Sequence, residues 1–129
     1  MIYLDTSVAL AHLLSEDRVP PASLWDNTLV SSRLLEYELW CRIHARGLAK
    51  SHGELVRELL SRIGFIELVR PALDRVTEAF PVPLRTLDAI HLASLDFLRA
   101  QGQSVQLASY DQRQLAAAKR MKIATLQLV

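Results

Sequence analysis

The sequence predicts an α/β fold in which a parallel sheet of about five strands is flanked by helices on both faces. Short runs of apolar and β-branched residues alternate along the chain with longer stretches of helical periodicity. This alternation is typical of a parallel sheet, because each crossover between parallel strands needs a connecting helix. The chain shows no repeat, low-complexity tract or linker, so residues 1–129 are expected to form a single domain.

The strand and helix boundaries follow from these runs and from glycine and proline positions. Strands are expected at Met1–Leu4, Thr28–Ser32, Phe65–Val69, Val105–Ser109 and Ile123–Leu126. Helices are expected at Ser7–Leu14, Arg33–Arg46, Ser51–Ile63, Pro71–Phe80, Thr86–Ala100 and Gln112–Met121. Pro71 suits the first position of a helix, and Gly47, Gly64 and Gly102 stand where three helices should end.

Composition excludes several classes of protein. Half of the residues are hydrophobic and 22% are charged, which is typical of a folded domain and not of a disordered chain. The single cysteine, Cys41, fits a reducing cytoplasm. Neither a secretory signal nor a membrane span is expected, because no apolar stretch is long enough. The net charge of +1 means that any nucleic-acid-binding surface must be local.

Four acidic residues fall where this topology meets one edge of the sheet. In right-handed strand–helix–strand units, the carboxyl ends of strands and the amino ends of helices share the edge at which open sheets bind ligands. Asp5 follows the first expected strand and Asp111 the fourth. Asp88 lies in the first turn of the fifth helix, and Glu38 lies in the second turn of the second helix. We therefore expect these four carboxylates to gather.

Gathered carboxylates repel one another and need a compensating cation. Hard divalent ions prefer oxygen ligands, so we expect Mg²⁺ or Mn²⁺ to be the cofactor. Such an ion can activate a water molecule and neutralise charge during attack on a phosphodiester. The pattern predicts metal-dependent phosphodiester hydrolysis.

Each acid also has an ordinary structural explanation. Asp5 could be a turn residue ahead of a Ser7 cap, and Asp88 could complement the helix dipole. Asp111 begins a capping-box pattern that ends at Gln114. The prediction of a metal site therefore rests on the presence of all four acids at one edge, and not on any single acid.

The second expected helix has two apolar stripes at 100° per residue. One contains Leu35, Leu39 and Ile43, and the other contains Leu34, Tyr37, Cys41, Ala45 and Leu48. Since one stripe can face the sheet and the other a partner, a homodimer is expected.

Glu38 lies in the gap between the two stripes, whereas Glu36 lies on the side of Arg33. We predict Glu38 as the ligand, because a carboxylate among apolar side chains is costly unless it is paired or metal-bound. A surface pair between Glu38 and Arg42 is the alternative.

Four segments, taken together, match a known pattern of acids. They are Met1-Ile-Tyr-Leu-Asp-Thr-Ser7, Ser32-Arg-Leu-Leu-Glu-Tyr-Glu-Leu39, Leu84-Arg-Thr-Leu-Asp-Ala-Ile-His-Leu-Ala93 and Leu107-Ala-Ser-Tyr-Asp111. They resemble the PIN domain, and most closely the toxin ribonucleases of VapBC-type toxin–antitoxin pairs. The likeness spans nearly the whole chain in the family's order, and the third segment is its most specific part.

The resemblance implies a small α/β/α domain with Mg²⁺- or Mn²⁺-dependent endoribonuclease activity. It implies a toxin that cleaves cellular RNA, often tRNA or rRNA, and inhibits translation. It also implies a homodimer held inactive by a cognate antitoxin. The residues that match the family's acidic quartet are Asp5, Glu38, Asp88 and Asp111, and those that match its supporting positions are Thr6 and Ser109.

Other polar residues lie near the predicted edge. Arg42, Arg85 and Arg113 could contact RNA phosphates, or each could be a solvated helix charge. His91 lies one turn after Asp88 and is expected to be structural.

Two other functions are compatible with parts of the pattern. A phosphatase could use Asp5 as its nucleophile, although such enzymes usually carry a second acid two residues later, where this chain has Ser7. A catalytically inactive PIN-like module could serve protein binding alone, but such modules usually lack one or more of the acids.

Overall fold

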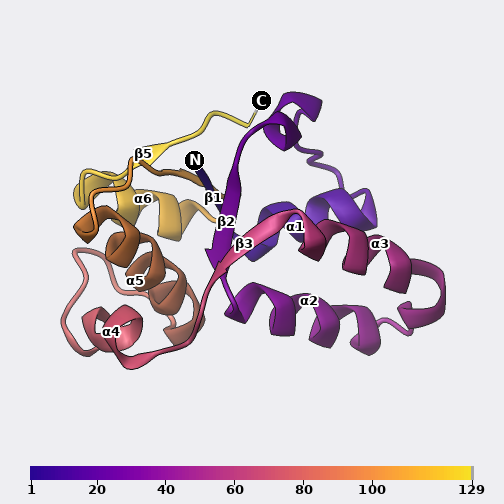
Figure 1. Cartoon of the computed structure of the whole chain (residues 1–129), viewed down its shortest axis with the longest axis horizontal. Coiled ribbons are helices and arrows are strands. Elements are labelled where there is room, and N and C mark those ends of the chain that lie inside the picture. Colours follow the sequence, from indigo (N-terminus) through magenta and orange to yellow (C-terminus); the bar gives the residue numbers. More distant parts are fainter. Residues whose placement is uncertain (129) are drawn as a thin grey trace.

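Five short strands form one parallel sheet in the computed structural model, which describes residues 1–128 (Figure 1). The strands are β1 (Ile2–Leu4), β2 (Leu29–Ser32), β3 (Ile63–Ile66), β4 (Gln106–Ala108) and β5 (Ala124–Thr125). Their order across the sheet is β3-β2-β1-β4-β5, and every neighbouring pair is parallel. The central strand β1 is therefore flanked by β2 and β4, whose carboxyl ends lie beside its own.

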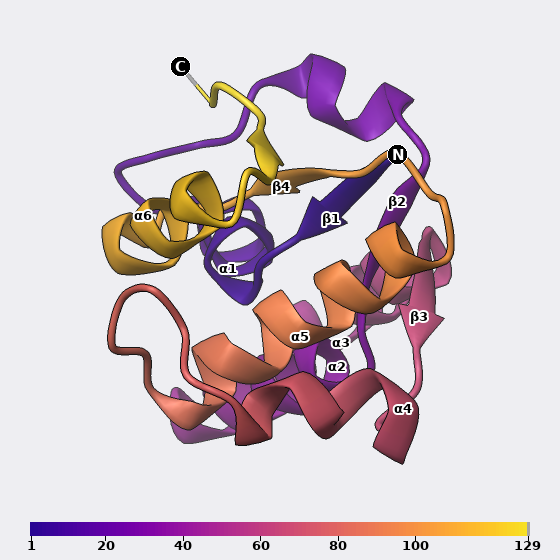
Figure 2. The same cartoon turned by 90° about the vertical axis from the view of Figure 1, so that its left-hand side faces the viewer.

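Helices cover both faces of the sheet. They are α1 (Thr6–Leu14), α2 (Leu34–Ala45), α3 (Ala49–Ser61), α4 (Arg70–Leu73), α5 (Thr86–Ala100) and α6 (Gln112–Arg120). Figure 1 shows α1, α2 and α3 on one side of the strands and α4, α5 and α6 on the other. In the turned view, α4 lies along α5 (Figure 2). The predicted α/β class, with a five-stranded parallel sheet between two helical layers, is confirmed.

The alternation of side chains along β1 supplies both halves of the core. Ile2 and Leu4 point into a cluster formed with α1, α2 and α3, while Tyr3 points into a cluster formed with α5 and α6. All three side chains are buried because both faces of a parallel sheet are covered. A polar hydroxyl on Tyr3 is thus placed deep in the second layer and must find partners there.

The α2 helix buries one of its two apolar stripes, as the helical periodicity predicts. Leu35, Leu39 and Ile43 are fully buried against the sheet layer. On the other stripe Tyr37 is 54% exposed and Cys41 is also exposed. This second stripe gives α2 an uncovered apolar face.

Two predicted elements are wrong in extent. The third strand, expected at Phe65–Val69, is β3 at Ile63–Ile66, because α3 already ends at Ser61 and Ile63 packs into the core. Gly64 consequently lies inside β3, paired with Val30, and does not end a helix.

The helix expected at Pro71–Phe80 is replaced by α4, a short 3₁₀ helix η2 (Asp74–Thr77) and a loop. Local side-chain bonds compete with helical ones here. Arg75 donates to the carbonyls of Glu78 and Ala79, and Thr77 donates to the carbonyl of Asp74.

A further 3₁₀ helix, η1 (Ala22–Asp26), has no counterpart in the sequence prediction. Within residues 1–128 no helix has the length and apolar character that a bilayer crossing requires.

Candidate active site

The four predicted acids lie at the end of the sheet where β1 and β4 finish and where α1, α2, α5 and α6 begin. Asp5 is the N-cap of α1 and Asp111 is the N-cap of α6. Asp88 lies in the first turn of α5, and Glu38 lies one turn into α2. The topology therefore positions all four as predicted. Asp5 is 5% exposed, whereas the other three are partly exposed.

Asp5 is held by four hydrogen-bond donors, which is how a carboxylate can be buried at low cost. Its Oδ2 accepts from the Ser7 amide at 3.1 Å, the Ser7 hydroxyl at 2.6 Å and the Ser109 hydroxyl at 3.2 Å. Its Oδ1 accepts from Nε2 of Gln114 at 3.2 Å. Oδ2 is therefore saturated, and Oδ1 is the oxygen with free accepting capacity.

Glu38 is fixed through a single oxygen. Its Oε1 accepts from the Thr6 hydroxyl at 2.6 Å and from Nε2 of His91 at 2.7 Å. The predicted alternative, a pair with Arg42, is wrong: among the described residues Glu38 pairs only with His91. Glu36 instead pairs with Arg33 at 3.0 Å, on the side that the helical periodicity predicts.

His91 connects Glu38 to the core. The ring is 1% exposed, and its Nδ1 lies 2.8 Å from the Tyr3 hydroxyl, which also accepts from the Ser32 amide at 3.1 Å. In the neutral ring Nε2 donates to Glu38 and Nδ1 accepts from the tyrosine hydroxyl, whereas in the protonated ring both nitrogens donate. Burial opposes protonation of His91, but the hydrogen bond to Glu38 and the nearby carboxylates hold the pKa of the imidazole above its ordinary value. The hydrogen bonds to Tyr3 and Glu38 explain why a histidine can lie on the buried face of α5.

Asp111 uses one oxygen to cap its helix. Its Oδ1 accepts from the Gln114 amide at 2.9 Å, and its own amide donates to the Ser109 hydroxyl at 3.0 Å. The structural explanations offered for Asp5 and Asp111 are both realised, with Asp5 rather than Ser7 as the cap of α1. Capping occupies only part of each carboxylate, so it leaves oxygen atoms for a ligand.

The pKa of Asp88 is affected by the other acids at this edge. The pKa of its carboxyl is raised, first by burial and then by the negative charges of Asp111, Asp5 and Glu38, while His91 opposes the shift. Carboxylates must lie within interaction range to act on one another in this way. The four acids therefore form one electrostatic unit.

The donor set of this unit fits a hard divalent cation. It offers carboxylate oxygens, and the fixed orientation of Asp5, Glu38 and Asp111 leaves one oxygen of each with spare capacity. Within residues 1–128 no three His, Cys, Asp or Glu side chains stand close enough to form a ready-made metal cage. A Mg²⁺-type ion does not need one, since it binds through a few carboxylates and keeps several waters.

The predicted arginines lie in two places. Arg85 and Arg113 border a hollow of about 280 Å³ that they share with Asp88 and Asp111. Arg42 is exposed on α2 and lines a separate hollow of about 330 Å³. The structure therefore brings two of the three arginines next to the acids.

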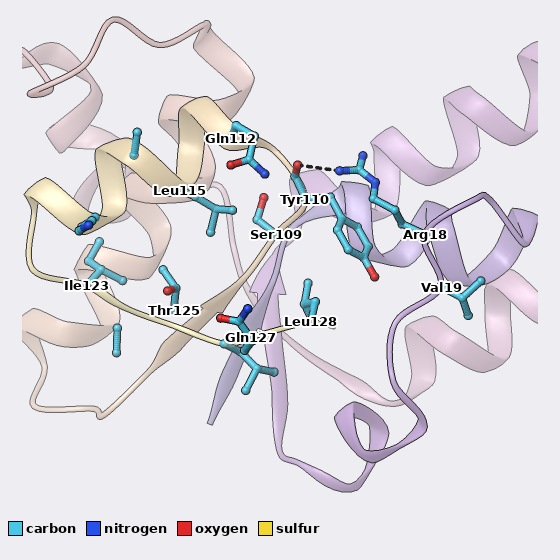
Figure 3. Close-up of a pocket in the computed structure, with 14 residues that line it drawn as sticks. Arg18, Val19, Ser109, Tyr110, Gln112, Leu115, Ile123, Thr125, Gln127 and Leu128 are labelled. Carbon is cyan, nitrogen blue, oxygen red and sulfur yellow. Dashed lines mark hydrogen bonds between the residues drawn. The ribbon is translucent and has the colours of Figure 1, made fainter.

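A larger groove, of about 980 Å³, adjoins the acids through Ser109 and Tyr110 (Figure 3). It lies between α6, the segment after β5 and the loop after α1, and its lining includes Arg18 and Lys119 but no acidic residue. The Arg18 guanidinium lies 4.6 Å from the centre of the Tyr110 ring and donates to the Tyr110 carbonyl at 3.3 Å. Positive charge is thus local to this side of the site.

Thr6 and Ser109, which the family resemblance implies as supporting residues, contact Glu38 and Asp5 respectively. Sequence reasoning missed three other residues that hold the acids in place. Ser7 and His91 were considered only as a cap and as a structural histidine, and Gln114 only as part of a capping box. His91 lies one turn from Asp88, and that spacing was a usable signal. The contacts of Gln114 and Tyr3 join residues 88 to 109 positions apart, for which local spacing gives no signal.

Comparison with known proteins adds an independent observation. The family model described as the PIN domain matches residues 2–120. The chain is 29% identical over 132 residues to ribonuclease VapC47 of Mycobacterium tuberculosis strain CDC 1551, covering 97% of this chain and 95% of that protein. It is 30% identical over 132 residues to ribonuclease VapC35 of strain H37Rv of the same species, covering 98% and 96%.

Replacing Tyr3 with phenylalanine tests the buried hydrogen bonds behind Glu38. The change leaves Nδ1 of His91 and the Ser32 amide without their partner, which should lower the free energy of unfolding by about 1–3 kcal/mol. Urea denaturation measures the loss. Tyr37→Phe removes a hydroxyl from a half-exposed ring and serves as the control. Equal stability of both variants would contradict the proposed network.

Proposed function

The chain belongs to the PIN domain family, and we propose that it is a divalent-metal-dependent endoribonuclease acting as the toxin of a toxin–antitoxin pair. The carrying observation is the convergence of Asp5, Glu38, Asp88 and Asp111 into one electrostatic unit at the carboxyl ends of the strands. The ribonuclease names of two full-length relatives support the same reaction. We propose that residues 1–129 act as one PIN domain.

The four acids are the proposed ligands of Mg²⁺ or Mn²⁺. Bound there, the ion supplies an activated water and neutralises charge that develops on the phosphate. Thr6 holds Glu38 in place and Ser109 holds Asp5, each through a hydroxyl donor. Their hydrogen bonds restrict the carboxylates to one orientation, and such supporting contacts strengthen metal sites.

The proposed substrate is cellular RNA, with tRNA or rRNA as the targets. Arg85 and Arg113 line one hollow with Asp88 and Asp111, which supports a role for both arginines in binding RNA phosphates. Arg42 lies farther out and is proposed to contact a more distant phosphate. Positive charge on Arg18 and Lys119 extends the basic surface along the groove beside the site.

Two protein partners complete the proposal. A cognate antitoxin would keep the ribonuclease inactive by covering the acids. A second copy of the chain would cover the uncovered apolar stripe of α2, where Tyr37 and Cys41 are exposed. We propose that the protein acts in the cytoplasm, where its RNA substrates are found.

Cleavage of RNA by the purified protein should require Mg²⁺ or Mn²⁺ and stop when EDTA is added. Glu38→Gln keeps the shape of the side chain but removes the charge that a hard cation needs, so cleavage should fall by about tenfold or more. Gel analysis of total RNA measures the products. Glu36→Gln is the matched control on the same helix, and it should leave cleavage unchanged. Cleavage that persists in EDTA would contradict the metal-dependent mechanism.

Expression of the chain alone in bacteria should arrest growth, because cleavage of tRNA or rRNA stops translation. Asp88→Asn removes one negative charge from the electrostatic unit formed by the four acids. It should abolish the growth arrest without loss of soluble protein. Growth curves and protein yield are the measurements. Co-expression of the cognate antitoxin should restore growth of the wild type. Identical growth of the wild-type and Asp88→Asn strains would argue against a toxin.

Light scattering at micromolar concentrations should give twice the mass of one chain. Tyr37→Lys places a charge on the exposed stripe of α2 and should shift the mass to that of a monomer. Leu55→Lys changes a similarly exposed apolar residue, 51% exposed on α3, and should leave the dimer intact. A monomeric wild type would exclude the homodimer.

A further inference from the structure

One residue of α6 touches two of the acids at once. The Gln114 backbone amide donates to Oδ1 of Asp111, and its side-chain Nε2 donates to Oδ1 of Asp5. The side chain is completely buried. Gln114 thus links the carboxylate that follows β1 with the carboxylate that follows β4.

The carboxylates of Asp5 and Asp111 repel each other. Asp5 and Asp111 follow neighbouring strands, since Leu4 on β1 is paired with Ala108 on β4. Both carry negative charge at the same edge of the sheet, and this is the cause of the repulsion. The side-chain amide of Gln114 donates to Asp5 and its backbone N–H donates to Asp111, so the residue opposes this repulsion without adding charge.

The contact to Asp5 is not redundant. The donors from Ser7 and Ser109 all reach Oδ2 of Asp5, and among the described residues Gln114 alone donates to Oδ1. Oδ1 is the oxygen with spare accepting capacity. The contact therefore ties α6 to the atom of Asp5 that is free to bind a ligand.

The donor to Asp5 is the only hydrogen-bonding group of the Gln114 side chain that has a partner among the described residues. The side-chain Oε1 is buried and has no hydrogen-bond partner within the described part of the chain. A buried acceptor left unpaired is destabilising, and a leucine or methionine of similar size would avoid it. The contribution of the glutamine therefore lies in its contact with Asp5, which a leucine or methionine cannot make.

We infer that Gln114 is a positioning residue that fixes the spacing between Asp5 and Asp111 for binding of a divalent cation. The inference rests on the proposed function, because it assumes that these acids bind the metal. Gln114 acts through the two carboxylates and is not assigned a contact with RNA.

Gln114→Leu and Gln114→Met test the inference with Mn²⁺ as the probe. Both remove the side-chain donor to Asp5 and also the unpaired Oε1, and both keep the backbone donor to Asp111. Titration calorimetry should show Mn²⁺ affinity lowered by about tenfold or more, as for other residues that support metal ligands. The melting temperature without metal should change little, because loss of the donor to Asp5 is offset by removal of the unpaired Oε1. RNA cleavage should be weak at low Mn²⁺ and recover at high Mn²⁺. Gln103→Leu, at an exposed loop position, is the control and should match the wild type.

Three results would overturn the inference. Wild-type Mn²⁺ affinity in both variants would show that the spacing does not depend on Gln114. Parallel loss of Mn²⁺ affinity and melting temperature in both variants, or failure of both to fold, would show that the residue is structural. A wild-type protein that binds no Mn²⁺ would overturn the proposed function together with the inference. The first two results leave the proposed function intact.

Discussion

The burial of Asp5 at the end of the central strand is the constraint on which the site depends. A carboxylate with 5% exposure must be met by donors, and the chain supplies them from three elements: the start of α1, the residue after β4, and α6. The same donors fix how α1 and α6 approach the sheet. Folding and the arrangement of the acids are therefore satisfied by one set of hydrogen bonds.

A second set of bonds holds Glu38 from the opposite layer. The chain of contacts runs from the Ser32 amide through Tyr3 and His91 to Glu38, and so joins β2, β1, α5 and α2. Both layers of helices are connected through it at the same edge. Each buried polar atom along this path is paired, which is the condition under which such networks rigidify a site.

The sequence was sufficient for the fold class and for the gathering of the acids, because both follow from period and topology. Strand β1 and helix α2 rest on local periodicity, and the structure agrees with both. The choice of Glu38 over Glu36 as a ligand stays a prediction, although Glu36 is engaged by Arg33 as the periodicity indicates. The ends of individual strands and helices were harder to predict. The region around Arg75 does not continue as a helix because its side chain bonds to nearby carbonyls. Gln114 and His91 contact Asp5 and Glu38 from distant segments, so no local pattern could reveal these two contacts.

Burial and then the negative charges of the neighbouring acids raise the pKa of Asp88, and the repulsion among these acids bears on how long the protein survives among proteases. A ligand that neutralises this edge binds the native chain and not the unfolded one, so it shifts the unfolding equilibrium by mass action. Degradation that proceeds through opened molecules slows as their population falls. The lifetime of the chain is thereby tied to the concentration of whatever occupies its acidic edge.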